Sequence, residues 1–200
     1  KSRAPYRGWV LRVAPDGTVT PIAGGLRSPA GMGFLEDGRL LVTDNQGDWM
    51  AVCPVYAIEE GAYYGHPASS RWYEGQVNIE PSDTLPIKRK REHPALWLPY
   101  QWSRSTGNVI QDKTGGPFDG QYFIAELTNG QVLRAEFEEI DGVLQGACWQ
   151  AHQRVGSAYH IEFGPDGTLY AGMTNRGWGG LAPGSGGARV KFNGGTPLDM

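Results

Sequence analysis

The stretch GMGFLEDGRLLVTDNQGDW (residues 31–49) holds the pattern from which the fold can be predicted. It reads as a short apolar strand, a turn at Asp-Gly, a second apolar strand and a polar loop. The same order returns in HIEFGPDGTLYAGMTNRGW (residues 160–178), and a partial copy, GNVIQDKTGGPFDGQYFIAELTNG, spans residues 107–130. The turn glycines Gly38 and Gly167 are 129 residues apart, a distance that holds several repeat units rather than one.

Hairpin patterns fill the chain between these copies. The segments VLRVAPDGTV (residues 10–19) and VLRAEFEEIDGVL (residues 132–144) each read as two strands joined by an Asp-Gly turn, and residues 187–192 supply a further strand for the last unit. Units of about 40 to 50 residues built in this way are typical of propeller blades, because a single four-stranded sheet cannot bury both its faces alone. The sequence therefore predicts an all-β propeller of four-stranded antiparallel blades, of which about three and a half are present.

The repeats also set the expected organisation of residues 1–200 as one partial propeller. We expect the outer strands of one blade at 9–22, a second blade at 31–104 with a long insertion at 61–104 that contains a short helix, and further blades at 105–150 and 157–200. An open arc of blades exposes apolar faces at both ends. The chain is therefore expected to be a fragment of a longer propeller whose missing blades cover those faces, or to self-associate.

Composition and charge disfavour several classes of protein. Thirty glycines and 14 prolines among 200 residues argue against a helix bundle, while 22 aromatic residues supply material for a core. The net charge of −3 argues against nucleic acid as a partner. No run approaches the roughly 20 apolar residues of a membrane span. The basic run at residues 88–91 is interpreted as a solvated loop, with a local anion or partner site as the alternative.

The two cysteines, Cys53 and Cys148, are far apart in the sequence and form no C-x-x-C pair, which disfavours a structural zinc site. Two separate buried thiols are the expected arrangement. A single disulfide stays open as the alternative, because the sequence does not fix the distance between the two residues.

Polar side chains gather where the expected strands end. In a propeller, the loop after the second strand of each blade and the connection between blades emerge on the same face, so residues in these segments are expected to line one pocket. Hydroxyl, amide and guanidinium groups suit a polyhydroxylated or anionic small molecule. The same residue types cap turns after strands in any β protein, and that interpretation stays open. The expected ligand-binding residues are Arg27, Asp44, Asn45, Gln46, Arg104, Thr128, Asn129, Asn175 and Arg176.

Two further kinds of chemistry are considered for the same loops. Asp44 and Asp48, together with nearby carbonyl oxygens, are candidate ligands for Ca²⁺, which takes six to eight oxygen atoms. His160 is a candidate general base, because an imidazole titrates near neutral pH. For this histidine the alternative is a packed or turn-bonded ring.

Three segments carry a resemblance to a known family: GLRSPAGM (residues 25–32), GRLLVTD (residues 38–44) and GAYYGHP (residues 61–67). They resemble the soluble quinoprotein glucose/sorbosone dehydrogenases, and most closely the bacterial dehydrogenase-like propeller domains that are often linked to haem modules. The resemblance implies a six-bladed propeller in which pyrroloquinoline quinone and Ca²⁺ occupy an axial site and aldoses are oxidised. It also implies a periplasmic or extracellular location.

The family's cofactor-binding positions are only partly kept in this chain. Its lysine falls at about Thr128, its Gly-Pro calcium ligands fall near Gln46 and Gly47, and its histidine base would precede Lys1. A tricarboxylate cofactor loses charge-assisted hydrogen bonds where basic residues are missing. The resemblance therefore implies a degenerate quinone site. The remaining correspondences are Arg27-Ser28 for the family's Arg-Asn pair and Ala158 and His160 for its arginine pair.

Three functions follow as hypotheses. The first is a dehydrogenase-like propeller that acts on a sugar or a sugar-derived aldehyde. The second is a non-catalytic propeller that binds carbohydrate or a partner protein through the same face. The third is a Ca²⁺-dependent lactonase-type hydrolase that uses Asp44 as a metal ligand.

Overall fold

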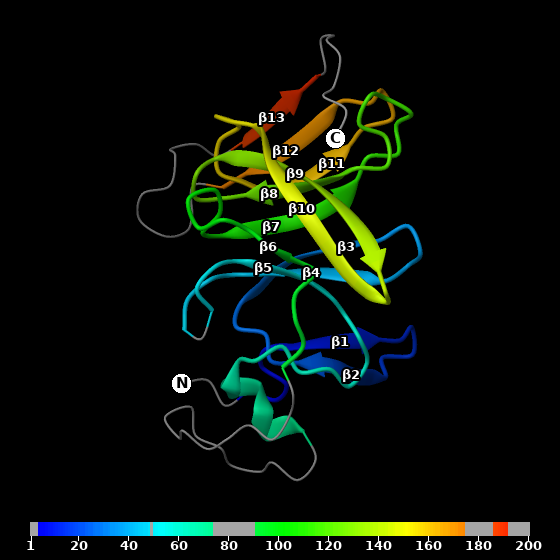
Figure 1. Cartoon of the computed structure of the whole chain (residues 1–200), viewed down its shortest axis with the longest axis vertical. Coiled ribbons are helices and arrows are strands. Elements are labelled where there is room, and N and C mark those ends of the chain that lie inside the picture. The colour runs from blue at the N-terminus through cyan, green and yellow to red at the C-terminus, as the bar shows by residue number, and fades with distance from the viewer. Residues whose placement is uncertain (1–3, 49, 74–90, 175–185, 192–200) are drawn as a thin grey trace.

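The structure, a computed structural model, describes residues 4–48, 50–73, 91–174 and 186–191. Within these ranges the chain forms four antiparallel sheets and one short 3₁₀ helix. The sheets follow one another along the long axis of the molecule in chain order (Figure 1). Each sheet contains strands that are consecutive in the sequence, which is the connectivity that the hairpin patterns predict.

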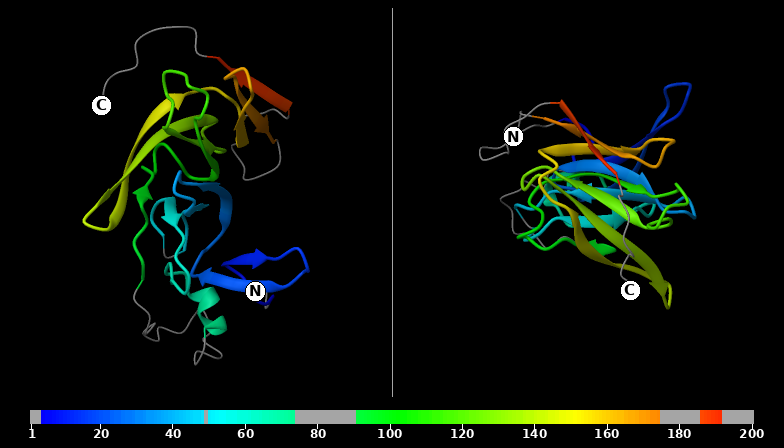
Figure 2. Two further views of the ribbon diagram at one scale, coloured as in Figure 1. Left: turned by 90° about the vertical axis from the view of Figure 1, so that its right-hand side faces the viewer. Right: turned by 90° about the horizontal axis from the view of Figure 1, so that it is seen from above.

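The strands of the four sheets have the following bounds. The first sheet contains β1 (Trp9–Val13) and β2 (Val19–Gly24); the second contains β3 (Pro29–Phe34), β4 (Leu40–Asp44), β5 (Pro54–Ala57) and β6 (Leu96–Trp97). The third contains β7 (Thr106–Gln111), β8 (Tyr122–Glu126), β9 (Gln131–Ile140) and β10 (Val143–His152), and the last contains β11 (Ala158–Phe163), β12 (Leu169–Met173) and β13 (Gly186–Val190). The predicted stacking of antiparallel sheets is confirmed; among the described residues the second and third sheets have four strands each, the last has three and the first has two. Figure 2 shows how the sheets fan out from one side.

Glycines allow the first strands of neighbouring sheets, β3, β7 and β11, to approach backbone to backbone. A Cβ atom added at Gly31 would lie 2.1 Å from the carbonyl oxygen of Gly107, and one at Gly33 would lie 1.9 Å from that of Val109. A Cβ added at Gly107 would in turn lie 2.0 Å from the carbonyl oxygen of Tyr159. No side chain fits at these distances, so the spacing of the sheets depends on glycine at these positions.

Side-chain hydrogen bonds join the same strands. The side-chain amide nitrogen of Asn108 donates to the carbonyl oxygen of Ile161 at 2.9 Å, and its Oδ1 accepts from the N–H group of Ile161 at 2.8 Å. On the other side of β7, the Thr43 hydroxyl donates to the carbonyl oxygen of Gly107 at 2.7 Å. Asn108 thus pairs with β11 much as a peptide group would, in a buried place where an unpaired polar group would be costly.

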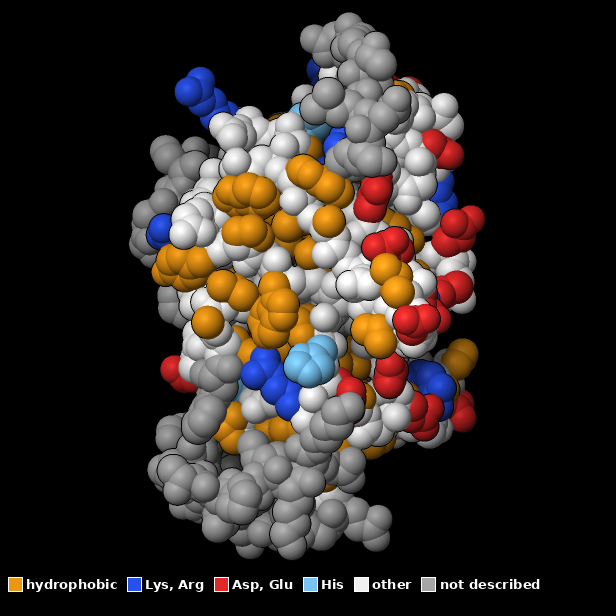
Figure 3. Space-filling view, in the orientation of Figure 1, with side chains coloured by type: hydrophobic (Ala, Val, Ile, Leu, Met, Phe, Trp, Pro, Cys, Tyr) orange, Lys and Arg blue, Asp and Glu red, His pale blue; other side chains and the backbone are white. Residues whose placement is uncertain are grey.

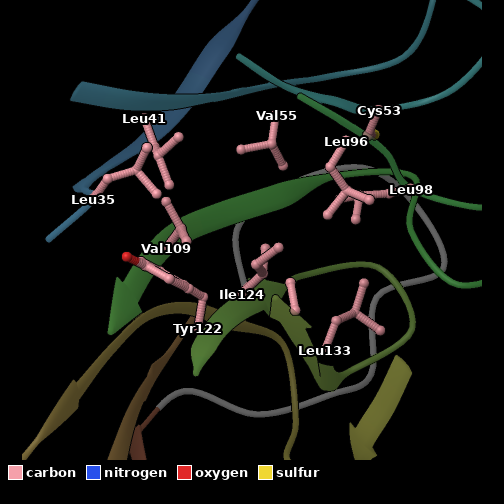
Figure 4. Packing of buried hydrophobic residues seen from close by; sticks show 11 residues of the cluster. Leu35, Leu41, Cys53, Val55, Leu96, Leu98, Val109, Tyr122, Ile124 and Leu133 are labelled. Atoms are coloured by element: carbon pink, nitrogen blue, oxygen red, sulfur yellow. The ribbon is translucent and has the colours of Figure 1, made fainter. Parts of the chain in front are cut away.

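The hydrophobic core lies between the stacked sheets. The second and third sheets enclose a cluster that includes Leu41, Val55, Val109, Ile124 and Leu133, and Figure 4 shows these side chains pointing toward one another from the two sheets. Two further clusters lie between the first and second sheets and between the third and last sheets. Burial between sheets is therefore what holds the stack together.

The long β9–β10 hairpin reaches across to the neighbouring sheet. Near its tip, Glu139 Oε2 lies 2.9 Å from Nη1 of Arg39, which follows the Asp-Gly turn between β3 and β4. Both side chains are substantially exposed, so we assign this ion pair a small share of the stability. Figure 3 shows acidic side chains along the side of this face where the hairpin lies, and hydrophobic side chains over its middle.

The insertion contains the expected short helix in 3₁₀ form, at Pro67–Trp72. His66 precedes it, and its Nδ1 accepts a hydrogen bond from the N–H group of Ala68 at 3.3 Å. Of the basic run, only Arg91 lies within the described residues, where its guanidinium carbon is 5.6 Å from the centroid of the Trp97 ring. No helix in the described part of the chain has the length and apolar character needed to cross a bilayer.

The two thiols are separate. Cys53 is buried and Cys148 is half-buried, and both are free. The expectation of two unpaired thiols is confirmed for Cys53 and Cys148, since no disulfide joins them.

Replacement of Gly107 by Ala tests the close approach of the inner strands. The added methyl group has no room against the Tyr159 carbonyl, so we expect the free energy of unfolding to fall by about 3 kcal/mol. Gly172→Ala is the matched control, because a Cβ there lies 3.6 Å from its nearest neighbour, the carbonyl oxygen of His160, and we expect a change within about 0.5 kcal/mol. Urea unfolding of both variants measures the difference, and equal stabilities would contradict the packing argument.

Candidate functional site

One cavity lies where the second strands of two neighbouring sheets end. It has a volume of about 310 Å³ and opens beside the ends of β4 and β8 and the connections that lead into β3 and β7. This volume is at the lower end of the range for small-molecule sites. The cavity is lined by Arg27, Asn45, Gln46, Gly47, Arg104 and Thr128. The structure thus brings together five of the residues that the sequence predicts as ligand-binding.

The other predicted residues lie elsewhere. Asn129 does not line the cavity. Its Nδ2 instead donates hydrogen bonds to the carbonyl oxygens of Gln101 at 3.1 Å and Trp102 at 3.0 Å. His160 lines a different cavity of about 390 Å³, beside β1, β3 and β7. Asp48 is exposed next to the cavity loop. The predicted residues Asn175 and Arg176 lie outside the described residues.

Asp44, the last residue of β4, is fully buried and does not line the cavity. Its Oδ2 accepts a hydrogen bond from the N–H group of Arg27 at 2.7 Å. Its Oδ1 accepts from the N–H groups of Ser28 at 2.7 Å and Asn45 at 2.8 Å. Burial raises the pKa of this carboxyl, and the three N–H donors oppose the shift. Both oxygens therefore already have main-chain partners.

Glu126, the last residue of β8, repeats this arrangement one sheet further along. Its Oε1 accepts from the N–H groups of Arg104, Ser105 and Thr128 at 3.1, 3.2 and 3.1 Å. Its Oε2 accepts from the N–H group of Asn129 at 2.6 Å. Burial raises the pKa of this carboxyl too, and the hydrogen bonds from its N–H donors again lower it. Sequence reasoning missed Glu126, although an acid at the end of a second strand, in the place of Asp44, was a usable signal.

The two arginines give the cavity its charge. A Cβ atom added at Gly47 would lie 2.3 Å from Cζ of Arg27, so the guanidinium packs directly on the glycine of the cavity loop. The guanidinium carbon of Arg104 lies 5.0 Å from the centroid of the Tyr100 ring. Asn45 accepts a hydrogen bond from the N–H group of Thr106 at 3.1 Å through Oδ1, which ties the loop after β4 to the start of β7.

The lining groups are chemically suited to binding rather than to proton transfer. Among the described lining residues there are guanidinium, amide and hydroxyl groups but no carboxylate or imidazole. Guanidinium groups pair with carboxylates and other anions, and amides bond to hydroxyl groups. In the described part of the chain, His, Cys, Asp and Glu side chains form no group of three or more that is suited to a metal ion. The chemistry that the cavity supports is the binding of an anionic or polyhydroxylated molecule.

Comparison with known proteins identifies the family. The sequence profile described as Glucose / Sorbosone dehydrogenase matches residues 54–181, which is more than half of the chain. The chain belongs to the glucose/sorbosone dehydrogenase family. The resemblance found in the sequence is thereby confirmed, although among curated proteins no significant match is found.

Solved structures with the same fold include sugar dehydrogenases. A protein of Thermus thermophilus described as an oxidoreductase (glucose dehydrogenase) matches with a TM-score of 0.62 and 22% identity over 88% of this chain and 51% of that chain. The pyrroloquinoline quinone-bound aldose sugar dehydrogenase of Streptomyces coelicolor matches with a TM-score of 0.62 and 15% identity over 91% of this chain and 50% of that one. The apo form of the soluble aldose sugar dehydrogenase of Escherichia coli matches with a TM-score of 0.57 and 15% identity, over 82% and 51%.

These structural matches bear on the fold. The prediction of a partial all-β propeller is confirmed by the four stacked sheets and by these neighbours. The chain of this glucose/sorbosone dehydrogenase family member spans about half the length of the solved structures that it matches.

Replacement of Gly47 by Ala tests the contact between the cavity loop and Arg27. The new methyl group would occupy the place of the guanidinium, so we expect the side chain of Arg27 to move and its Nε–Hε NMR resonance to shift. Gly38→Ala is the control, because that glycine also has a positive φ (88°) but no atom lies within 4 Å of the added Cβ. Each variant carries a backbone cost of about 1–2 kcal/mol. An unchanged Arg27 resonance in Gly47→Ala would contradict the contact.

Proposed function

We propose that this chain forms part of a dehydrogenase-like propeller that acts on a sugar or a sugar-derived aldehyde and whose quinone site is degenerate. The observation that supports the proposal is the joining of Arg27 and Arg104 with the amides of Asn45 and Gln46 around one cavity, in a member of the glucose/sorbosone dehydrogenase family. Amide and guanidinium groups are common partners of sugar hydroxyl groups. The proposed location of the protein is the periplasm or the extracellular space.

The cavity fits pyrroloquinoline quinone in part. Two guanidinium groups suit the carboxylates of the quinone, and a solved neighbour binds this cofactor. The position at which the resemblance places a lysine is Thr128, however, and this residue lines the cavity with a neutral side chain. Ala158 is fully buried and His160 lines another cavity, so neither supplies an arginine for the carboxylates. We therefore derive no catalytic step through the quinone.

We propose that any Ca²⁺ in this region is bound only by exposed oxygen atoms. The lactonase hypothesis uses the Asp44 carboxylate as a metal ligand, whereas three main-chain N–H groups already bond to its two oxygens. Asp48 is exposed and remains a candidate ligand.

A non-catalytic carbohydrate-binding propeller is the second candidate function. It is favoured by the lining of the cavity, where the described side chains include no imidazole or carboxylate that could act as a general base. In this case the same arginines and amides would bind a sugar without oxidising it.

Dye reduction and calorimetry separate the two candidates. The chain is incubated with Ca²⁺ and pyrroloquinoline quinone, supplied with aldoses, and assayed for reduction of an artificial electron acceptor; parallel titrations measure sugar binding. We expect sugar binding with no dye reduction by the 200-residue chain, because the cofactor contacts are incomplete. Robust aldose oxidation would show that the quinone site is intact and would overturn its description as degenerate.

Replacement of Arg27 by Ala tests the cavity itself. Loss of a charge-assisted hydrogen bond is expected to weaken binding of sugar or quinone about tenfold or more, with the melting temperature little changed. Arg12→Ala is the control, since Arg12 is an exposed arginine of β1 that does not line the cavity. Equal affinities in Arg27→Ala and Arg12→Ala would rule out this cavity as the ligand site.

A further inference from the structure

We propose that Asp44 and Glu126 are positioning residues of the cavity: each holds by main-chain hydrogen bonds the two loops whose side chains line it. The inference takes this cavity to be the ligand site of the proposed function and adds how the site is assembled. Neither carboxylate lines the cavity, so neither is placed to touch a ligand.

The hydrogen bonds of the two carboxylates coincide with the cavity lining. Of the six lining residues, Arg27 and Asn45 donate their main-chain N–H groups to Asp44, while Arg104 and Thr128 donate theirs to Glu126. A hydrogen bond from the main-chain N–H group of a residue fixes the position of its Cα atom, from which the side chain extends. Each carboxylate thus fixes the Cα positions of one arginine and one polar residue of the lining.

Each carboxylate joins two segments that are distant in sequence. Asp44 connects the loop after β4 with the connection before β3, since it binds the N–H groups of Arg27 and Asn45. Glu126 connects the loop after β8 with the connection before β7, through Arg104 and Thr128. The carboxylates are therefore the points at which each pair of loops is brought together, and a carboxylate accepts several N–H donors where a neutral group accepts fewer.

The last sheet shows that the stacked-sheet fold does not itself require this carboxylate. The last residue of β12, in the place of Asp44 and Glu126, is Met173. The loop and connection are joined there by a main-chain bond, from the N–H group of Thr174 to the carbonyl oxygen of Ser157 at 3.1 Å. The third sheet has the equivalent bond, from the N–H group of Leu127 to the carbonyl oxygen of Ser105 at 2.9 Å, and has the hydrogen bonds of Glu126 in addition. The acid is thus found in the two sheets whose loops form the described cavity, which favours a role in the site over a general role in blade folding.

Hydrogen exchange in the full 200-residue chain tests the assignment without any ligand. In Asp44→Asn, one side-chain oxygen is replaced by an amide group that cannot accept, so the amides bound to that oxygen lose their partner. We expect exchange of the Arg27 amide to quicken about tenfold or more, with the Arg104 amide unchanged. Exchange is read residue by residue from ¹H–¹⁵N NMR spectra.

Glu126 offers a graded series, which also serves if Asp44→Asn folds poorly. Glu126→Gln can keep its carbonyl oxygen toward Arg104, Ser105 and Thr128, so we expect faster exchange mainly at Asn129. Glu126→Ala removes both acceptors, and all four amides are then expected to exchange faster. A merely structural defect would raise exchange across the whole chain instead.

Asp112→Ala, which removes both acceptor oxygens, is the matched control. Asp112 is a buried acid whose Oδ1 accepts from the Thr114 N–H group at 2.9 Å, but it follows the other end of β7, away from this cavity. We expect amide exchange to become faster near Thr114 and to stay unchanged at the cavity amides.

Two results would overturn the positioning role: unchanged exchange at Arg27 in Asp44→Asn together with unchanged exchange at Arg104 in Glu126→Ala, or a uniform rise over the chain in both variants. A titration of the same variants with pyrroloquinoline quinone then asks about function. If the parent chain binds neither quinone nor sugar, the proposed function fails, whereas the exchange pattern still decides the positioning role.

Discussion

This structure depends on close backbone-to-backbone packing of the strands β3, β7 and β11. At Gly31, Gly33 and Gly107 the neighbouring carbonyl oxygen occupies the space of a side chain. This approach sets the sheets at a spacing at which the apolar clusters between them can close. It also brings the loops at one end of β4 and β8 close enough to enclose a common cavity.

The cavity then depends on buried charge. Loops of polar residues have little apolar surface to hold them, so their main-chain N–H groups need acceptors. Asp44 and Glu126 supply these acceptors from the ends of the strands, and they leave the side chains of Arg27 and Arg104 available to the cavity. Both acids are fully buried, so their carboxylates are held there against the cost of desolvation, which raises the pKa of each.

Much of the fold could be predicted from local patterns, and part of the site could as well. The Asp-Gly turns near Gly38 and Gly167 and the hairpin around Gly142 appear as expected, because such turns depend on a few adjacent residues. Asp44 was correctly placed at the strand end, but its carboxylate faces its own main chain rather than the cavity. Glu126 was missed because two of its hydrogen-bond partners, Arg104 and Ser105, are more than 20 residues away in the sequence.

The sequence alone determined the β repeat, the order of the strands and the polar character of the strand ends, because alternation, turn chemistry and composition act over short distances. Only the tertiary structure decided which polar residues share a cavity. Arg27, Arg104 and Thr128 meet because the sheets stack at a fixed spacing, whereas His160 turns into another cavity on the same stack. Orientation about a strand end follows from packing and hydrogen bonding across sheets, and no local pattern encodes it.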